Sequence, residues 1–510
     1  MIDPARLPVW GRWLIGLTVL RAAFAVVIPP TPEEAYHWNF GVHLDWSYYD
    51  HPGMIGWSIA LGRAIFGDVP FAIRFVPLFF AAGTSALLAR LASKMYGERA
   101  ALWAVLLLTI QPVTFVTAAS GYPDSPMLFF WALTMSLVWE ALDTGRGSFW
   151  IPASATLGLG MISKYTIVFF GVSMIFYLLT SKRDRRWLAT PWPYLAAVLA
   201  LVVFTPVTYW NATHDWASIK FQGKERFSSA NEFLPLAFAK FLGQQWGAVV
   251  PFTLPLAVAA VWRTARSSRP DEKYLFWCFA PMMAFFAALS WRMPTHTLWP
   301  LPAWLGITVA MAGMIPEAAD RVSKVYARVG PWIAGTTLVL LFLVDLHMAV
   351  FFPKIPMPSP IHGWPVVAAR VKDLRAELPP GSFVLGVGRK YTVPALLAWH
   401  LRAPFDVYGE TVLGESSNQY DLWTDLRKLE GRDAVVLVEL WKGEKKSQDR
   451  LAKSFRSVES AGDLVVPLRG GSPLKFALYR ARGYIPTPLS RRATSSETPD
   501  TPESTPARER

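Results

Sequence analysis

Long apolar stretches separated by short polar connections dominate the first 352 residues of this 510-residue chain. A helix that crosses a bilayer needs about 20 mostly apolar residues, and the pattern predicts eleven such spans. Their expected bounds are 10–28, 70–89, 100–118, 125–142, 149–163, 165–181, 191–209, 243–262, 274–291, 297–315 and 331–352. The apolar run at 52–66 is too short to span, so it predicts an interfacial or re-entrant helix.

The pattern changes after about residue 353, where shorter apolar runs alternate with polar segments. Buried strands are expected at 382–388 and 433–439, and helices at 393–401 and 421–429. This alternation is typical of a small α/β domain, expected over 353–485. From 486 to 510, Pro, Ser, Thr and charged residues leave little to bury, which predicts a disordered tail. The predicted fold class is an α-helical polytopic membrane protein with a C-terminal α/β outer domain.

Composition and charge agree with a membrane protein. The chain is 53% hydrophobic and 17% charged, whereas a soluble chain carries about 25% charged residues. Its net charge of +13 does not indicate a nucleic-acid partner, because Lys and Arg fall in short clusters between apolar runs, for example at 182–186. Placing the N-terminus in the cytoplasm puts most of these clusters inside and the C-terminal domain outside. The single cysteine, Cys278, excludes an intrachain disulfide.

Acidic residues gather on the predicted outer face, at the ends of several spans. They are Glu33, Glu34, Asp50 (followed by His51) and Asp124. Basic or titratable residues expected on the same face are Arg63, Arg74, Lys164, Arg292 and His296. A charge next to hydrocarbon costs kilocalories and is seldom kept without a use. Their common location therefore predicts a reaction centre at one water–lipid boundary.

Several of these residues belong to recognisable segments. They are Glu33–Trp38, His43–Pro52, Tyr122–Pro126, Ser163–Thr166, Trp210–Trp216, Phe221-Gln222, His296–Pro300 and Asn418–Trp423. In this order they resemble the landmarks of GT-C glycosyltransferases of the family 39/83 type. That group includes protein O-mannosyltransferases, lipid A aminoarabinose transferases and lipopolysaccharide-core galacturonosyl transferases. The family motif usually opens with Asp-Glu, so Glu33-Glu34 leaves open which carboxylate faces the substrates.

The resemblance implies a bacterial inner-membrane enzyme with a cytoplasmic N-terminus and a periplasmic C-terminal domain. It implies transfer of a sugar, with inversion, from a polyprenyl-phosphate donor on the periplasmic face. Lipid A, core oligosaccharide, a polymer and protein all remain possible acceptors. No cofactor is required, although Glu33, Asp50 and His296 offer oxygen and nitrogen ligands for a divalent cation. No spacing in the sequence demands such an ion.

The chemistry suggests a role for each residue. A base must take a proton from the acceptor hydroxyl, and Glu33 is the first choice, with Asp124 second. The departing phosphate gains negative charge, which fixed positive groups stabilise; Lys164 is the first choice for this role. The other residues expected to bind substrate are Glu34, Asp50, His51, Arg63, Arg74, Arg292 and His296.

Structural explanations compete with these roles. Glu33 or Glu34 fits a helix N-terminus, Asp50 a turn and Asp124 a helix cap. Lys164 and Arg292 fit side chains that reach to lipid headgroups, and His296 an interfacial histidine. A transporter or flippase of lipid-linked sugars is the alternative function, but it predicts charges near the midplane and two related halves. A scaffold that binds envelope partners would not explain the acidic clusters.

Overall fold

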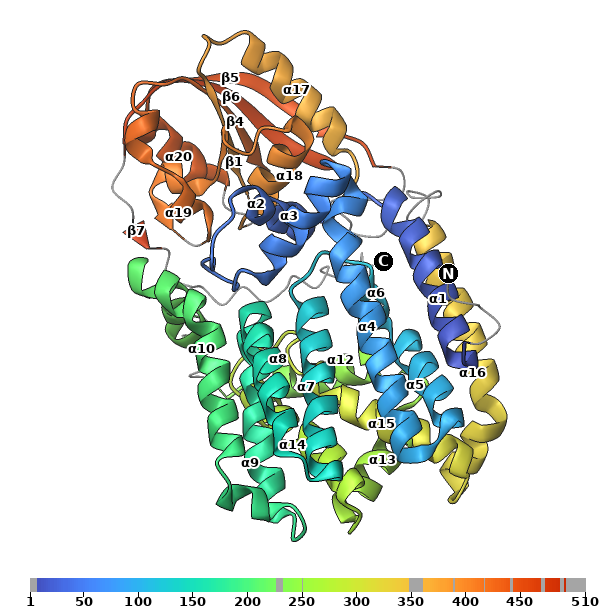
Figure 1. Ribbon diagram of the computed structural model, residues 1–510. Coiled ribbons are helices and arrows are strands. Elements are labelled where there is room, and N and C mark those ends of the chain that lie inside the picture. The colour runs from blue at the N-terminus through green and yellow to red at the C-terminus, as the bar shows by residue number, and fades with distance from the viewer. Residues whose placement is uncertain are drawn as a thin grey trace.

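One end of a bundle of long helices carries an α/β domain (Figure 1). The computed structural model describes residues 7–225, 233–249, 251–347, 361–388, 390–416, 418–440, 444–468, 473–486 and 490–491. The bundle comprises α1 (Val9–Val27), α4 (Pro70–Tyr96), α5 (Glu98–Ile110), α6 (Pro112–Ala118), α7 (Asp124–Thr144), α8 (Trp150–Ser163), α9 (Val168–Thr180), α10 (Trp192–Thr213), α11 (Ala217–Lys220), α12 (Pro235–Gln244), α13 (Leu254–Arg266), α14 (Pro270–Ser290), α15 (Ala303–Glu317) and α16 (Arg321–Leu346). The length and apolar composition of several of these helices confirm a multi-pass membrane protein.

Helices occupy most of the predicted spans, but their lengths differ. Within the described residues, six helices are long and apolar enough to cross a membrane: α1, α4, α7, α10, α14 and α16. The expected span at 100–118 is the pair α5 and α6, bent by 84° at Gln111, and would be a seventh. The helices α8, α9 and α15 are shorter than a standard span. The boundary expected at Ser163-Lys164 is confirmed, because Lys164 is extended (φ −159°, ψ 133°) between α8 and the next helical turn.

Prolines explain two differences from the predicted spans. The span expected at 243–262 is broken: α12 ends at Gln244, a π-helical turn follows, and α13 begins only at Leu254. Pro251 lies in the break and has no backbone N–H with which to continue a helix. The span expected at 297–315 begins later, because Pro302 caps α15 at its start. Apolar composition alone does not reveal such interruptions.

The outer part of the molecule combines a sheet with helices from two distant segments. From the first long connection come α2 (Pro32–Val42) and α3 (Met54–Phe66). The C-terminal segment supplies α17 (Trp364–Ala376), β1 (Phe383–Val387), α18 (Thr392–Leu401), β2 (Val407–Tyr408), β3 (Glu415–Ser416), α19 (Tyr420–Trp423), β4 (Ala434–Glu439), α20 (Glu444–Ser454), β5 (Phe455–Val466), β6 (Leu474–Tyr484) and β7 (Ser490–Arg491). The two strands and the first helix predicted there are confirmed as β1, β4 and α18.

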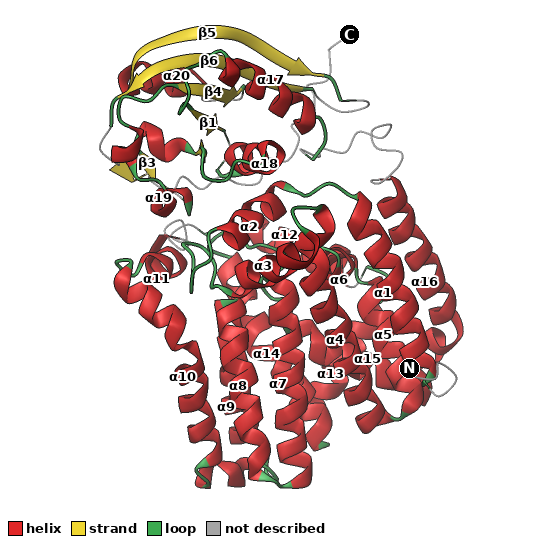
Figure 2. Cartoon of the chain, turned by 45° about the horizontal axis from the view of Figure 1, so that its top comes forward, coloured by secondary structure: helices red, strands yellow, loops and turns green. Residues whose placement is uncertain are grey.

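The main sheet has the order β2-β1-β4-β6-β5. Strand β1 runs parallel to β2 and β4, while β6 runs antiparallel to both β4 and β5. Helices cover both faces near β1, so this strand is buried throughout and reads as a continuous apolar run. Figure 2 shows the strands of the main sheet on the side of the domain away from the bundle, with α18, α2 and α3 between them and the long helices.

The first connection and the C-terminal domain share one hydrophobic core. Tyr36 and Phe40 of α2 and Ile59 of α3 are buried in the same apolar cluster as Val384 of β1 and Leu397 of α18. Because this cluster joins segments more than 300 residues apart in sequence, α2 and α3 act as the floor of the domain. The predicted domain division separates them. The predicted boundary near residue 353 lies outside the described residues, as does the tail except for 490–491.

One predicted helix of the domain is wrong. The segment 421–429 contains the last three residues of the short helix α19 and a separate 3₁₀ turn at Leu426–Leu429. Asp425 divides them, because its side chain accepts a hydrogen bond from the backbone N–H of Arg427 and so starts a new turn. Such local side-chain bonds compete with helix continuation.

A candidate active site beneath the α/β domain

The start of α2 fixes where the two neighbouring glutamates point. Thr31 caps the helix: its Oγ1 accepts from the backbone N–H of Glu34 at 3.2 Å, and its own N–H donates to Glu34 Oε2 at 3.0 Å. Pro32 at the first helical position is already set to helical geometry. Consecutive residues of a helix point about 100° apart. Glu33 and Glu34 therefore face different surroundings.

Glu34 is held by Arg74 of α4, and we call these two residues the locked pair. Arg74 Nε donates to Glu34 Oε1 at 2.7 Å and Nη2 donates to Oε2 at 2.6 Å. The Gly121 N–H adds a bond to Oε1 at 3.0 Å. Burial would raise the pKa of Glu34, but these donors outweigh it and hold the pKa below its ordinary value. The carboxylate is fully buried, so it has a structural environment that the sequence did not indicate.

Arg74 is occupied on its other side too. Its guanidinium donates to the carbonyls of Ala25, Ile28 and Pro29, at 3.1, 2.6 and 3.1 Å. These carbonyls belong to the end of α1 and the turn after it. The locked pair therefore ties α1, α2 and α4 together. The guanidinium of Arg74 binds acceptors of the protein itself, whereas the sequence analysis expected it to bind substrate.

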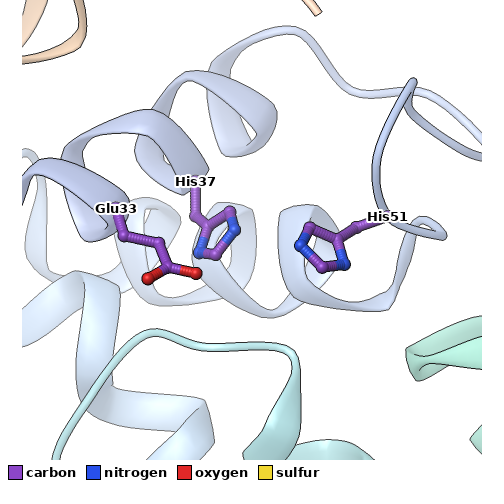
Figure 3. A group of neighbouring side chains, drawn as sticks. All are labelled: Glu33, His37 and His51. Carbon is purple, nitrogen blue, oxygen red and sulfur yellow. The ribbon is translucent and has the colours of Figure 1, made fainter. Parts of the chain in front are cut away.

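Glu33 points in a different direction from Glu34 and belongs to a group that we call the open group: Glu33, His37 and His51. One ligand atom from each lies within 4.8 Å of the others (Figure 3). Glu33 and His37 are one turn apart on α2, whereas His51 comes from the connection to α3. Burial raises the pKa of Glu33 to about 7, and the charge of Asp124 adds to the effect. A carboxyl poised near neutrality suits proton transfer.

His37 was not among the residues singled out from the sequence. Its Nδ1 lies 2.9 Å from the carbonyl oxygen of Gly121. Its Nε2 is buried and has no hydrogen-bond partner among the described residues. Burial lowers the pKa of this side chain to about 4, so the imidazole is neutral near pH 7. The spacing Glu33…His37 on a predicted helix was a usable signal, because residues four apart share a face.

Asp124 and Lys164 form a buried ion pair next to the open group. Lys164 Nζ donates to Asp124 Oδ1 at 2.7 Å, and both side chains are less than a tenth exposed. Asp124 is the first residue of α7, and the structure records no capping bond from a side chain at the start of this helix. The charges of both residues act on the pKa of Glu33, Asp124 raising it and Lys164 lowering it. Glu33 and Asp124, the first and second choices for the base, thus lie close together, with Lys164 beside them.

Asp50 completes the polar rim and links it to the C-terminal domain. Tyr36 Oη donates to Asp50 Oδ1 at 3.4 Å and accepts from the backbone N–H of Gln419 at 3.0 Å. The Tyr36 ring stacks on Tyr391 with centroids 3.9 Å apart. Gln419 Oε1 also accepts from the N–H of Tyr49 at 2.6 Å. The C-terminal domain therefore braces the connection that carries Asp50 and His51.

Other expected residues have different surroundings. Arg63 pairs with Asp68 at 2.5 Å and donates to the Gly41 carbonyl at 2.7 Å, which anchors α3 to α2. Arg292 and His296 lie in the turns after α14 with exposed side chains. The trio Glu33, Asp50 and His296 considered for a cation does not assemble; His37 and His51 take the other two places. His51 was expected at the site, whereas His37 was missed; the two histidines meet because a loop brings His51 back over α2.

Fold and site together define a polytopic helical membrane protein whose acidic and basic side chains meet under an α/β domain. Residues 50–210 match the family model described as dolichyl-phosphate-mannose-protein mannosyltransferase. The matched segment contains Asp50, Asp124 and Lys164, and ends at Trp210.

Two curated bacterial proteins are similar to this chain. A lipid A galacturonosyltransferase, RgtD, of Rhizobium johnstonii is 25% identical over 54% of this chain and 59% of its own length. An undecaprenyl phosphate-α-4-amino-4-deoxy-L-arabinose arabinosyl transferase of Pseudomonas fluorescens is 24% identical over 59% of this chain and 54% of its own length. The aligned parts thus span less than two thirds of either relative.

Among solved structures, ArnT from Cupriavidus metallidurans bound to undecaprenyl phosphate has a TM-score of 0.63 to this chain. The likeness covers 92% of this chain and 98% of that one, at 15% sequence identity. It shows that the chain has the same fold, membrane helices and C-terminal domain included. Fold, family match and relatives confirm the predicted resemblance to GT-C glycosyltransferases.

Proposed function

We propose that the protein is an integral-membrane glycosyltransferase that moves a sugar from a polyprenyl-phosphate donor to a glycolipid of the cell envelope. The observation that carries this proposal is the position of Glu33, which faces the buried pair of Asp124 and Lys164 within a GT-C fold. The relatives named above are all transferases, and one solved neighbour holds undecaprenyl phosphate. Transfer is therefore favoured over transport of lipid-linked sugars.

Glu33 is the proposed general base. Its carboxylate takes the proton from an acceptor hydroxyl while that oxygen forms a bond to the anomeric carbon. The bond from this carbon to the phosphate oxygen breaks, and its electron pair leaves with the lipid phosphate. Attack from the side opposite the phosphate inverts the anomeric centre. Glu34 cannot take this role, because the Arg74 guanidinium and two backbone N–H groups already bind its oxygens.

Lys164 is the proposed partner of the departing phosphate. An ammonium has three N–H donors, and Asp124 accepts one of them at 2.7 Å. The remaining donors can bind phosphate oxygens as these gain charge, which favours the transition state over the bound substrate. Asp124 then holds the ammonium in place. This is a positioning role, and Asp124 is not proposed as the base.

The same arrangement supports a proposal for the location. The open group lies at the end of the bundle under the α/β domain. The basic connections at 182–186 and 263–273, which come at the C-terminal ends of α9 and α13, lie at the other end of the bundle (Figure 1). By the positive-inside rule we place the N-terminus in the cytoplasm and the domain in the periplasm of a bacterial inner membrane. Nucleotide sugars are absent there, which fits a lipid-carried donor. Lipid A or core glycolipid is the proposed acceptor, ahead of polymer or protein.

Mass spectrometry of envelope glycolipids tests the proposal. A strain without this protein should lack one sugar on a lipid A or core species, and the wild-type protein should restore it. Glu33→Gln should accumulate to the wild-type level in the membrane and fail to restore it. Glycolipid profiles that are identical with and without the protein would contradict the proposal.

A further inference from the structure

The open group has the composition of a metal site. Two imidazole nitrogens and one carboxylate oxygen, from Glu33, His37 and His51, lie within 4.8 Å of one another. Three protein ligands of these types, with a further position left for substrate, are typical of catalytic zinc. Figure 3 shows the Glu33 carboxylate and the His51 ring on either side of His37, both turned toward it.

His37 supplies the independent observation. A carbonyl oxygen only accepts hydrogen bonds, so the 2.9 Å contact with Gly121 requires the proton of His37 to be on Nδ1. Its Nε2 then carries a lone pair, yet this atom is buried without a partner among the described residues, in a side chain only 1% exposed. A buried acceptor left without a partner is destabilising. Metal-binding histidines are held in this way, with the second nitrogen bonded to a backbone carbonyl.

We propose that Glu33, His37 Nε2 and His51 bind one divalent transition-metal ion, of which Zn²⁺ fits the ligand set best. Ligand atoms around a tetrahedral zinc lie about 3.4 Å apart, so the group, whose ligand atoms lie within 4.8 Å of one another, must close by no more than about 1.4 Å. Glu33 and His51 are partly exposed, and rotations of their side chains supply this movement. His37 stays fixed by its bond to Gly121.

The ion would act at the same site, so its role in the reaction rests on the proposed function, although its binding does not. A metal ion lowers the pKa of a hydroxyl bound to it. The acceptor hydroxyl would take the open position, and Glu33, bound through one oxygen, would keep the other free for the proton. Asp124 and Lys164 lie beside the group but outside the ligand set.

Cobalt titration of the full-length protein tests the site. The protein is purified in detergent with a tag that contains no histidine, stripped with a chelator and titrated with Co²⁺, whose visible absorption reports tetrahedral coordination. One Co²⁺ per chain, displaced by Zn²⁺, is expected. Glu33→Gln, His37→Gln and His51→Gln should each weaken binding by at least about tenfold.

His43→Gln is the matched control. His43 caps the same helix, but its ring packs between Phe405 and Trp423, outside the group. Its binding curve should equal that of the wild type. His51 lies in a connection, so His51→Gln keeps the test valid if His37→Gln fails to fold, as judged by size-exclusion chromatography.

Two outcomes separate this inference from the proposed function. The inference is overturned if the wild-type protein transfers sugar but binds no metal. It is also overturned if His51→Gln binds metal as the wild type does. Either result leaves the proposed function unaffected. Stoichiometric binding that all three variants weaken, in a protein that transfers no sugar, supports the metal site and counts against the function.

Discussion

The locked pair and the open group begin at adjacent residues of one helix and have opposite properties. Glu34 has its oxygens bound by Arg74 and by two backbone N–H groups, and its pKa is held low. Glu33 has no hydrogen bond to its carboxylate among the described residues, and burial raises its pKa to about 7. The capped start of α2 creates the difference, because it aims one carboxylate at α4 and the other at the rim of the bundle. Charge at a membrane boundary can thus hold helices together or remain available for chemistry.

Removing the charge of Glu34 should have the largest effect on stability. Glu34→Gln leaves the Arg74 guanidinium buried without its counter-ion, which costs about 3–5 kcal/mol of unfolding free energy. Thermal unfolding in detergent should show a large drop in the midpoint. Glu33→Gln is the control and should change stability by less than about 1 kcal/mol. Equal losses in the two variants would remove the distinction between the regions.

The pair Asp124–Lys164 should contribute both to stability and to sugar transfer. Asp124→Asn or Lys164→Met leaves a buried charge unpaired and should cost about 2–3 kcal/mol. The double variant removes both charges, so its loss should be smaller than the sum of the single losses. Transfer should fall about 100-fold in Lys164→Met and stay low in the double variant, because the phosphate has lost its donor. If the double variant recovered both transfer and stability, Asp124 and Lys164 would have only a structural role, like Glu34 and Arg74.

The brace from the C-terminal domain should have a moderate, local effect. Gln419→Ala removes the acceptor for the Tyr49 N–H, worth about 1–2 kcal/mol. Hydrogen exchange in 43–52 should become faster while the bundle is unchanged. Leu422→Ala, an exposed side chain on α19, is the control. Unchanged exchange in Gln419→Ala would show that the domain does not order the open group.

Arg63 should give the smallest change. Its pair with Asp68 is partly exposed, and such pairs contribute about 0–1 kcal/mol. Arg63→Gln should therefore lower the unfolding midpoint slightly and leave the rate of sugar transfer at the wild-type value. A large loss of transfer with unchanged stability would restore Arg63 to the substrate-binding role expected from the sequence.

Local patterns explain what could be predicted from the sequence. The start of α2 follows from Thr31-Pro32 with Glu34 three residues after Thr31, and the strands β1 and β4 follow from their apolar runs. Glu33, Asp124 and Lys164 were placed together because they share one end of the spans. The break before α13 was missed, since hydropathy does not register a turn made of apolar residues.

Tertiary contacts explain the rest. Nothing near Glu34 in sequence indicates Arg74, 40 residues away, so the two glutamates could not be told apart. His51 meets His37 only because the connection between α2 and α3 folds back. The shared core of α2, α3 and the C-terminal domain depends on contacts across more than 300 residues. Sequence patterns locate many of the elements, whereas contacts between distant elements decide which charged side chains are bound by other protein groups.

The most direct measurement is the release of polyprenyl phosphate from the proposed sugar-loaded donor by the purified protein, with lipid A as the proposed acceptor. The wild type should turn over, and Glu33→Gln should be slower by about 10²–10⁴-fold with an unchanged unfolding midpoint. Glu34→Gln should lose activity only in proportion to its loss of folded protein. Full turnover by Glu33→Gln would contradict the assignment of Glu33 as the residue that takes the proton from the acceptor.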